Sequence, residues 1–200
     1  MRVLFVCTGN TCRSPMAEAW LKKRCPNVEV QSAGIFAAKN VRANEYAIQS
    51  LKEQAISLDH RSQPVTKRLL QWADIVLTMT TQHKQSLIMQ YPDFQDKFFT
   101  LKEYVSEADK AVWDRLKKLY ADYEEKRVLF IRENEHKMDR AVLEKKLQDH
   151  LQNEWQEIER LESMLTSYDI SDPFGGDLDV YRETLEEIGK YVDLLVEKIT

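Results

Sequence analysis

Residues 3–15 read VLFVCTGNTCRSP, and they join an apolar run to a helical pattern through a short polar loop. The first four residues of this stretch form an apolar run typical of a buried strand, and its last residue is a proline at the start of a helical pattern. Cys7 and Arg13 therefore stand six positions apart, where a strand passes through a short loop into a helix. This arrangement predicts an anion-binding loop.

The loop has the features of a phosphate cradle. The residues between Cys7 and Arg13 allow the backbone to wrap so that successive N–H groups point inward, and the following helix directs its positive end to the same place. This field favours the thiolate form of Cys7, which is the nucleophilic form. We expect Gly9 and Asn10 to supply the positive φ angles of such a turn.

The end of the loop adds a ligand for the anion and a helix start. The planar guanidinium of Arg13 matches two oxygens of a phosphoryl group. Ser14 is predicted to cap the helix, and Pro15 suits the first helical position because its missing N–H would have no helical partner there.

The stretch resembles the signature of the low-molecular-weight protein tyrosine phosphatase family, Cys-x-Gly-Asn-x-Cys-Arg-Ser-Pro at the end of the first strand. All seven specified positions match. Family members also carry a late Asp-Pro that supplies a general acid, and this chain has Asp172 and Pro173 in the run DPFGG. The resemblance implies an α/β fold: a parallel four-stranded sheet flanked by helices, doubly wound as in flavodoxin.

Outside the loop, strand-like and helix-like patterns alternate, which is typical of a parallel sheet with helices on both faces. Ligands of such sheets bind beyond the carboxyl ends of the strands, where Cys7 stands. The predicted strands span residues 3–6, 28–32, 75–79 and 98–101. The predicted helices span residues 15–24, 43–54, 66–72 and 178–199, with a further helix ending near residue 91.

Composition limits the class of protein. The 200 residues are 43% hydrophobic and 31% charged, which suits one soluble domain with an embellishment, and the net charge of −4 argues against nucleic-acid binding. No apolar run approaches the roughly 18 residues of a membrane helix, and the first strand begins too early for a signal peptide to precede it. Three cysteines, two of them in one loop, fit a reducing compartment. We therefore expect a cytoplasmic protein without nucleic-acid or membrane partners.

Residues 106–168 depart from the alternating pattern. They hold 12 Lys/Arg and 15 Asp/Glu in 63 residues, and the chain has neither proline nor glycine between Pro92 and Pro173. Because family members reach the Asp-Pro after a short connection, we interpret this segment as a helical insertion in a phosphatase domain formed by residues 1–105 and 169–200. Its two apolar stripes at helical spacing are Trp113, Leu116, Tyr120, Tyr123 and Phe130, and Leu143, Leu147, Leu151, Trp155, Ile158, Leu161 and Leu165.

Geometry predicts that the insertion is an antiparallel hairpin. A single helix of 63 residues would span about 95 Å, but both ends must return to the host sheet. A turn at residues 134–137 gives two arms and sets Tyr120 near Leu151. The aromatic surface of the arms favours a role in binding a protein partner or in self-association.

The resemblance implies a two-step reaction that uses no metal and no cofactor. Cys7 attacks phosphorus, Arg13 and the loop amides hold the phosphoryl oxygens, and Asp172 protonates the leaving group. The same carboxylate then activates the water that hydrolyses the phosphocysteine. The other residues expected to bind phosphate or substrate are Thr8, Gly9, Asn10, Thr11, Cys12, Ser14 and Phe174.

Two residues outside the loop are expected to support it. Ser32 matches a family serine that steadies Asn10, although a serine at a strand end is equally typical of a turn. His60 stands where family members often place a loop-supporting histidine, and we interpret it as structural rather than catalytic.

The preferred substrate depends on Thr11. Most tyrosine-specific members of the family have a bulkier aliphatic residue here, whereas members that act on protein phosphoarginine carry threonine. Phe174 favours the same branch, because tyrosine-specific members more often have tyrosine or tryptophan after the Asp-Pro, and its ring can stack on a guanidinium. Residues 83–85 and 99–105 also resemble the bacterial arginine-directed branch. The resemblance thus implies phosphorylated protein substrates, phosphoarginine preferred, with phosphotyrosine as the alternative.

The sequence leaves two remote alternatives to a phosphatase and indicates a redox function of the loop. Arsenate reductases have a very similar loop but use two further cysteines in mid-chain, and this chain has only Cys25, interpreted as a core residue. A scaffold protein acting through its helical insertion is the other alternative, and turnover of a phosphorylated test compound distinguishes it from an enzyme.

Cys12 lies five positions from Cys7, and this pair predicts a reversible redox switch.

Overall fold

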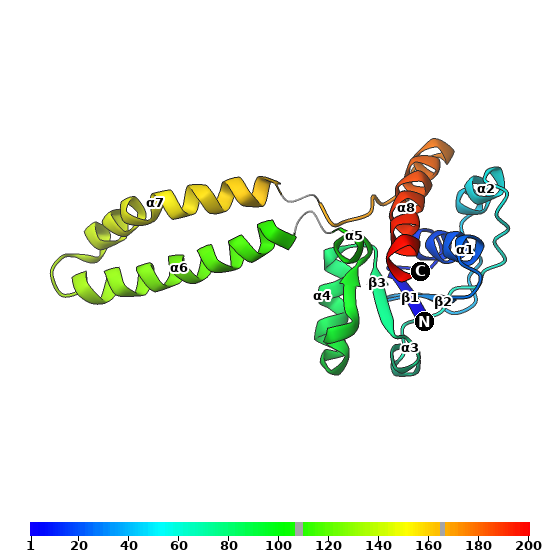
Figure 1. Cartoon of the computed structure of the whole chain (residues 1–200), viewed down its shortest axis with the longest axis horizontal. Coiled ribbons are helices and arrows are strands. Elements are labelled where there is room, and N and C mark those ends of the chain that lie inside the picture. Colours follow the sequence, from blue (N-terminus) through cyan, green and yellow to red (C-terminus); the bar gives the residue numbers. More distant parts are fainter. Residues whose placement is uncertain (107–109, 165–166) are drawn as a thin grey trace. The chain divides into compact units, whose positions relative to one another are not determined.

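The structure, a computed structural model, describes residues 1–106, 110–164 and 167–200 (Figure 1). It divides into two compact units, residues 1–105 with 168–200, and residues 106–167. In chain order the elements are β1 (Arg2–Cys7), α1 (Arg13–Arg24), β2 (Glu29–Gly34), α2 (Glu45–Glu53), α3 (Lys67–Trp72), β3 (Ile75–Thr78), α4 (Thr81–Gln90), the 3-10 helix η1 (Pro92–Lys97), β4 (Phe98–Thr100), α5 (Leu101–Val105), α6 (Lys110–Asn134), α7 (Arg140–Met164) and α8 (Leu178–Ile199).

A four-stranded parallel sheet forms the centre of the first unit. Its strand order is β2-β1-β3-β4. Residues 3–6 of β1 are fully buried because both faces of the sheet are covered, which explains why this strand is a continuous apolar run rather than an alternating one. The predicted fold class is confirmed.

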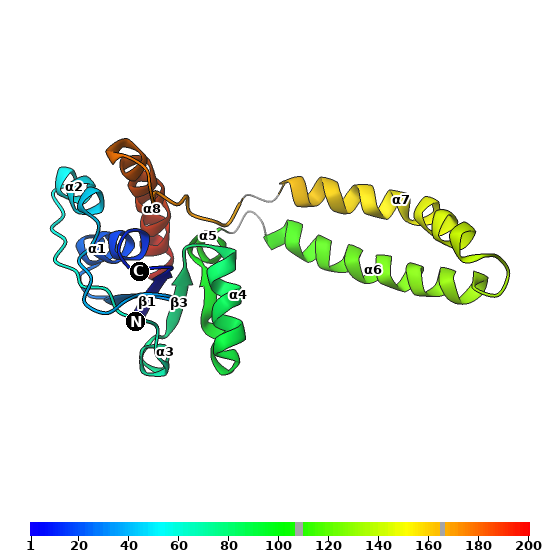
Figure 2. The same cartoon turned by 180° about the vertical axis from the view of Figure 1, so that it is seen from behind.

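Helices cover the two faces of the sheet (Figure 2). On one face, α1, α2, α5 and α8 contribute Met16, Leu51, Leu101 and Leu185 to a core that includes Phe5. On the other face, α3 and α4 pack Leu70 and Leu87 against Leu4 and Val6. The helices that follow β1 and β3 therefore lie on opposite faces, which opens a crevice at the carboxyl ends of these two neighbouring strands.

The start of α1 differs from its prediction. The helix begins at Arg13 with Cys12 as its N-cap, and no side chain caps it. The predicted capping role of Ser14 is wrong, because this residue is already in the first turn and its hydroxyl faces the loop. At the fourth strand, Leu101 begins α5 instead of ending β4.

The second unit consists of α6 and α7, which lie side by side and run in opposite directions (Figures 1 and 2). Leu116, Ile158 and Leu161 form its small core. Tyr123 packs on Trp155, with ring centroids 6.1 Å apart. The Tyr120 hydroxyl donates a hydrogen bond to Glu162.

The predicted pairing of Tyr120 with Leu151 is therefore wrong. Glu162 and Leu151 are eleven residues apart on α7, about 16 Å along the helix. The chain reverses at residues 135–139, later than the predicted turn, and this shift changes which residues face each other. Two predicted stripe positions, Leu165 and the side chain of Trp113, lie outside the described residues.

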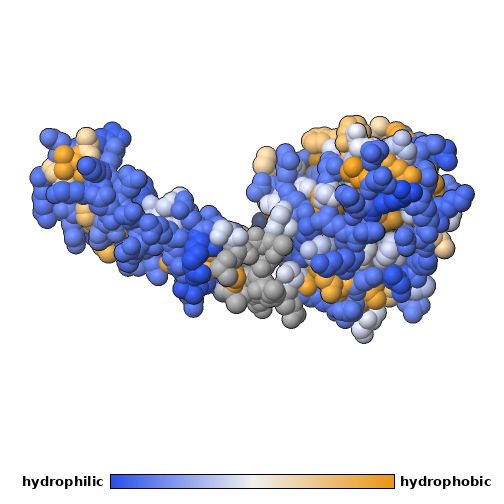
Figure 3. Space-filling model, turned by 90° about the horizontal axis from the view of Figure 1, so that it is seen from above, coloured by the Kyte–Doolittle hydropathy of each residue, from blue (hydrophilic) through white to orange (hydrophobic). Residues whose placement is uncertain are grey.

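The surface of the helical unit is mainly hydrophilic, with apolar side chains gathered near the turn (Figure 3). Val128, Leu129 and Val142 are among the exposed apolar residues of this unit. Within the described ranges, no helix is both long enough and apolar enough to cross a membrane.

Candidate active site

The loop between β1 and α1 occupies the crevice at the carboxyl end of β1. Cys7 ends the strand and is 3% exposed. Its Sγ accepts a hydrogen bond from the Asn10 N–H at 3.3 Å and lies 3.0 Å from Ser14 Oγ. The Asn10 side chain donates from Nδ2 to Ser14 Oγ at 3.0 Å, and the Ser14 O–H has two acceptors within reach, the Cys7 sulfur and the Ala33 carbonyl oxygen at 3.4 Å. The Asn10 N–H and the Ser14 hydroxyl therefore both lie beside the Cys7 sulfur.

Asn10 provides the left-handed turn in the loop. Its φ is 55°, whereas Gly9 is not among the positive-φ residues of the described chain. The prediction that Gly9 also takes a positive φ is wrong. The left-handed backbone conformation is less favourable for asparagine than for glycine. The hydrogen bonds of the Asn10 side chain offset this cost in free energy.

A buried polar network holds Asn10 from behind. Asn10 Oδ1 accepts hydrogen bonds from the Gln63 N–H at 2.9 Å and from His60 Nε2 at 3.1 Å. Its Nδ2 donates to Ser32 Oγ at 2.8 Å, and Ser32 donates in turn to Glu18 Oε2 at 2.6 Å. Ser32 and His60 thus lie where support for the loop was expected.

Glu18 and Gln63 belong to this network but are not among the predicted site residues. Glu18 follows Ser14 by four residues on α1, so helical periodicity places both on one face. No comparable local signal exists for Gln63, because its contact with Asn10 joins residues 53 positions apart.

Arg13 and Asp172 meet at the mouth of the site. Arg13 Nη2 donates to Asp172 Oδ2 at 2.8 Å, and the arginine side chain is 6% exposed against 55% for the aspartate. Arg13 Nη1 also donates to the Ile170 carbonyl at 3.4 Å. The Ile170 N–H donates to the Met79 carbonyl at 2.8 Å, which fixes the Asp-Pro loop to the end of β3.

These residues enclose a cavity of about 220 Å³, lined by Cys7, Thr8, Gly9, Thr11, Cys12, Arg13, Asp172 and Phe174. Asn10, Ser14, Ser32 and His60 are not among its lining residues. The Phe174 ring is 82% exposed, and its backbone N–H donates to Asp172 Oδ1 at 3.2 Å. The cavity therefore joins a nucleophile, a cation and a carboxylate beneath an uncovered aromatic ring.

Cys12 has a partner that was not predicted. Its Sγ lies 3.3 Å from the hydroxyl of Tyr181, a buried residue in the first turn of α8. Burial raises the pKa of the Cys12 thiol above its ordinary value, despite hydrogen bonds from Tyr181 and Thr11 that lower it. Cys12 is therefore a protonated thiol at neutral pH.

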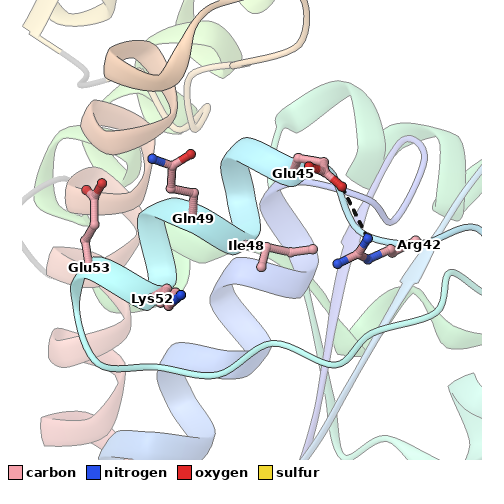
Figure 4. Close-up of a pocket in the computed structure, with 6 residues that line it drawn as sticks. All are labelled: Arg42, Glu45, Ile48, Gln49, Lys52 and Glu53. Atoms are coloured by element: carbon pink, nitrogen blue, oxygen red, sulfur yellow. Dashed lines mark hydrogen bonds and ion pairs between the residues drawn. The ribbon is translucent and has the colours of Figure 1, made fainter.

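A second, open hollow of about 570 Å³ lies along α2 (Figure 4) and is lined by Arg42, Glu45, Ile48, Gln49, Lys52 and Glu53. Arg42 Nη1 pairs with Glu45 Oε1 at 3.2 Å. Its lining offers no cysteine, serine or histidine, whereas the cavity around Cys7 brings together a nucleophile, a cation and a carboxylate and is therefore the candidate active site.

Comparisons with known proteins agree with this assignment. The sequence pattern described as "Low molecular weight phosphotyrosine protein phosphatase" matches residues 2–156. A protein-arginine-phosphatase of Geobacillus stearothermophilus is 36% identical over 199 residues, covering 99% of this chain and 95% of that protein. One of Bacillus subtilis is 52% identical over 110 residues, covering 53% of this chain and 73% of that protein.

Among solved structures, a mutant of the YwlE arginine phosphatase with a phosphorylated active-site serine matches with a TM-score of 0.68 and 33% identity. The match covers 100% of this chain and 95% of that one. The chain therefore belongs to the low molecular weight phosphotyrosine protein phosphatase family.

Proposed function

We propose that the chain is a protein-arginine phosphatase that works through a phosphocysteine intermediate. The observation that carries the proposal is the meeting of Cys7, Arg13 and Asp172 in one cavity, with Thr11 and Phe174 among its lining residues. Relatives named protein-arginine-phosphatase support the choice of substrate.

The first step transfers the phosphoryl group to sulfur. The Cys7 thiolate attacks phosphorus, the S–P bond forms, and the P–N bond to the substrate guanidino nitrogen breaks. Asp172 donates its proton to the departing nitrogen, so the product leaves as an arginine side chain. The loop amides and Arg13 hold the phosphoryl oxygens while charge redistributes among them.

The second step releases phosphate. Asp172, now a carboxylate, accepts a proton from water, the water oxygen bonds to phosphorus, and the S–P bond breaks to restore the Cys7 thiolate. Arg13 already holds the Asp172 carboxylate at 2.8 Å in the structure, so a single cation contacts the general acid and faces the phosphate site.

Specificity for a flat, cationic guanidinium follows from the lining of the cavity. The exposed Phe174 ring can stack on the guanidinium, and the adjacent Asp172 carboxylate can face its N–H groups. Thr11 lines the wall, and the resemblance to the arginine-directed branch of the family implies that a threonine here favours the guanidinium. The alternative, a phosphotyrosine phosphatase, uses the same nucleophile and general acid.

The test is the change in substrate preference caused by Thr11→Ile. We expect the ratio of kcat/KM for a phosphotyrosyl peptide to that for the matching phosphoarginyl peptide to rise about tenfold, because isoleucine replaces the Thr11 hydroxyl with a longer apolar group that suits an aromatic ring better than a guanidinium. Thr200→Ile, at the end of the chain, is the matched control. An unchanged ratio in Thr11→Ile would place the selectivity elsewhere.

We also propose that residues 106–168 are an insertion in a phosphatase domain of residues 1–105 and 169–200, and that it binds a protein partner or a second copy of the chain. Support comes from Val128, Leu129 and Val142, whose apolar side chains are exposed near the turn. A cytoplasmic location completes the proposal, since a thiol nucleophile needs a reducing compartment.

Two variants test the role of the insertion. Replacing residues 107–167 with a short flexible linker should leave turnover of a small substrate within a few-fold while weakening recognition of a protein substrate or self-association. In the full chain, the double variant Val128→Lys/Val142→Lys should also leave turnover of a small substrate within a few-fold. It should weaken recognition of a protein substrate or self-association. Loss of small-substrate turnover in a truncated protein that retains its circular dichroism would instead make the insertion part of the active site.

A further inference from the structure

His83 lies against the phosphate loop, although it comes from another part of the chain. It is in the first turn of α4, which follows β3, and β3 pairs with β1. Parallel strands bring their carboxyl ends to one edge, so the start of α4 meets the loop that follows β1. The His83 residue is 8% exposed.

Both ring nitrogens of His83 have a threonine partner. Nε2 lies 2.8 Å from Thr8 Oγ1, and Nδ1 lies 2.9 Å from Thr80 Oγ1. Thr80 is the N-cap of α4, and its hydroxyl oxygen also accepts the His83 backbone N–H at 3.2 Å. The imidazole thus connects a helix start to the first residue of the loop after Cys7.

The hydrogen bonds of Thr80 fit one of the two neutral tautomers of His83. Burial, and then the positive charge of Arg13, lower the pKa of His83 to about 4, with Asp172 and Asp169 acting in the opposite direction. The ring is therefore neutral at neutral pH and has one donor and one acceptor. We take the ring proton to reside on Nε2: in this tautomer the Thr80 oxygen accepts the His83 backbone N–H while its O–H donates to Nδ1.

This tautomer leaves the Thr8 hydroxyl proton free. The His83 Nε2–H donates to Thr8 Oγ1, so the Thr8 O–H is not consumed by the histidine. Thr8 lines the cavity that holds Cys7 and Arg13. The hydrogen bond from His83 holds the Thr8 oxygen in place and does not use the hydroxyl proton. The Thr8 hydroxyl can therefore donate a hydrogen bond to an anion in the cavity.

We infer that His83 is a positioning residue of the phosphate site: through Nε2–H it holds the Thr8 hydroxyl so that this hydroxyl donates to an oxygen of the bound phosphoryl group. The inference rests on the proposed function, because it assigns a further donor to the same cavity. His83 itself does not transfer a proton to the substrate.

The variants Thr8→Val, His83→Leu and His83→Gln test the inference. Thr8→Val and His83→Leu should each lower kcat/KM about tenfold and weaken competitive inhibition by inorganic phosphate by a similar factor, as expected for a lost hydrogen bond to a charged group. The amide of His83→Gln can still donate to Thr8, and glutamine is favoured at this position of a capped helix, so this variant should regain most of the loss. His136→Leu, an 89% exposed histidine in the turn after α6, is the matched control.

The double variant Thr8→Val/His83→Leu should be no worse than either single variant, because both remove the same donor. Independent losses that multiply, or a Thr8→Val variant with unchanged phosphate inhibition, would overturn the inference. If His83→Leu fails to fold, inhibition of Thr8→Val by inorganic phosphate, compared with that of the wild-type protein, still tests whether the Thr8 hydroxyl binds the anion.

An NMR measurement separates this inference from the proposed function. The nitrogen shifts of His83 in the wild-type protein report its tautomer without any turnover, and we expect the Nε2–H form. An Nδ1–H form would contradict the inference even in an active phosphatase. A protein with the Nε2–H form, intact phosphate binding and no phosphatase activity would instead refute the proposed function.

Discussion

Arg13 and Asp172 form a charged hydrogen bond of 2.8 Å although they lie 159 positions apart in the chain. The arginine is buried and the aspartate is more than half exposed, so the pair joins the floor of the cavity to its rim. Arg13 thus links the loop that binds the phosphoryl group to the segment that carries the general acid.

Asp172→Asn should lower kcat by about 10²–10⁴, because an amide can neither protonate the leaving nitrogen nor activate water. Inhibition by inorganic phosphate should persist, since Arg13 and the loop are intact. Steady-state kinetics with a phosphate titration measure both quantities. Asp96→Asn, at an exposed carboxylate of η1, is the control. Equal turnover in the Asp172→Asn and wild-type proteins would remove Asp172 from the mechanism.

Asn10→Gly should destabilise the fold by about 2–4 kcal/mol, because it removes the hydrogen bonds that the Asn10 side chain makes with Ser14, Ser32, His60 and Gln63. The matched control is Asn40→Gly. Asn40 has a φ of 62°, close to the 55° of Asn10, but it is exposed. In Asn40→Gly relief of the left-handed backbone should make the change in unfolding free energy near zero or slightly favourable. Urea unfolding of both variants measures the difference, and similar values would mean that the side-chain network contributes little.

Lys102 and Glu187 fix the segment that carries the general acid. Lys102 Nζ lies 2.6 Å from Glu187 Oε1 and donates to the Asp169 carbonyl at 2.7 Å. Glu187 Oε2 accepts the Ser171 N–H at 3.0 Å. Burial alone would raise the pKa of Glu187, but the bonds from Lys102 and Ser171 outweigh it and hold this pKa below its usual range.

The lowered pKa of Glu187 predicts a pH-dependent loss of stability. Its contribution is complete above the usual glutamate pKa of about 4.3 and is lost as the pH falls through the lower pKa of the folded state. Glu187→Gln should therefore be about 1–3 kcal/mol less stable than wild type at pH 7, with the difference shrinking below about pH 4. Glu186→Gln, at the exposed neighbour, is the control. A difference that does not change with pH would contradict this role of the ion pair.

Peroxide should produce a reversible Cys7–Cys12 disulfide. The oxidised Cys7 sulfur is a sulfenic acid, and the Cys12 thiol condenses with it to form the S–S bond and release water. A dithiol should restore activity, and Cys25→Ser should behave as wild type. Mass spectrometry would contradict the prediction if it found Cys7 only as the sulfinic or sulfonic acid.

The sequence predicted the sheet because its strands are apolar runs separated by helical patterns. Residues 3–6 lie within β1, and the strands predicted at 28–32, 75–79 and 98–101 correspond to β2, β3 and β4. The loop motif also indicated that Cys7 and Arg13 would face one anion site, because both belong to a single short segment.

Contacts between residues that are far apart in the sequence could not be predicted from local sequence patterns. His83 and Gln63 approach the loop only because the parallel sheet brings separate connections to one edge, and Gln63 has no signal in its own neighbourhood. The polar run TTQHK directly after the third strand could have indicated a capped helix start beside the site. The hairpin register failed for another reason: the turn lacks glycine and proline, so nothing local fixed its centre.

The most direct test of the account is the kcat/KM of the wild-type protein on two peptides of the same sequence, one with phosphoarginine and one with phosphotyrosine. We predict that phosphoarginine is hydrolysed at least about tenfold more efficiently, which corresponds to about 1.4 kcal/mol of transition-state discrimination, and that Cys7→Ser abolishes both activities. Equal or greater efficiency on phosphotyrosine would contradict the assignment as an arginine phosphatase, and full activity of Cys7→Ser would contradict the cysteine mechanism.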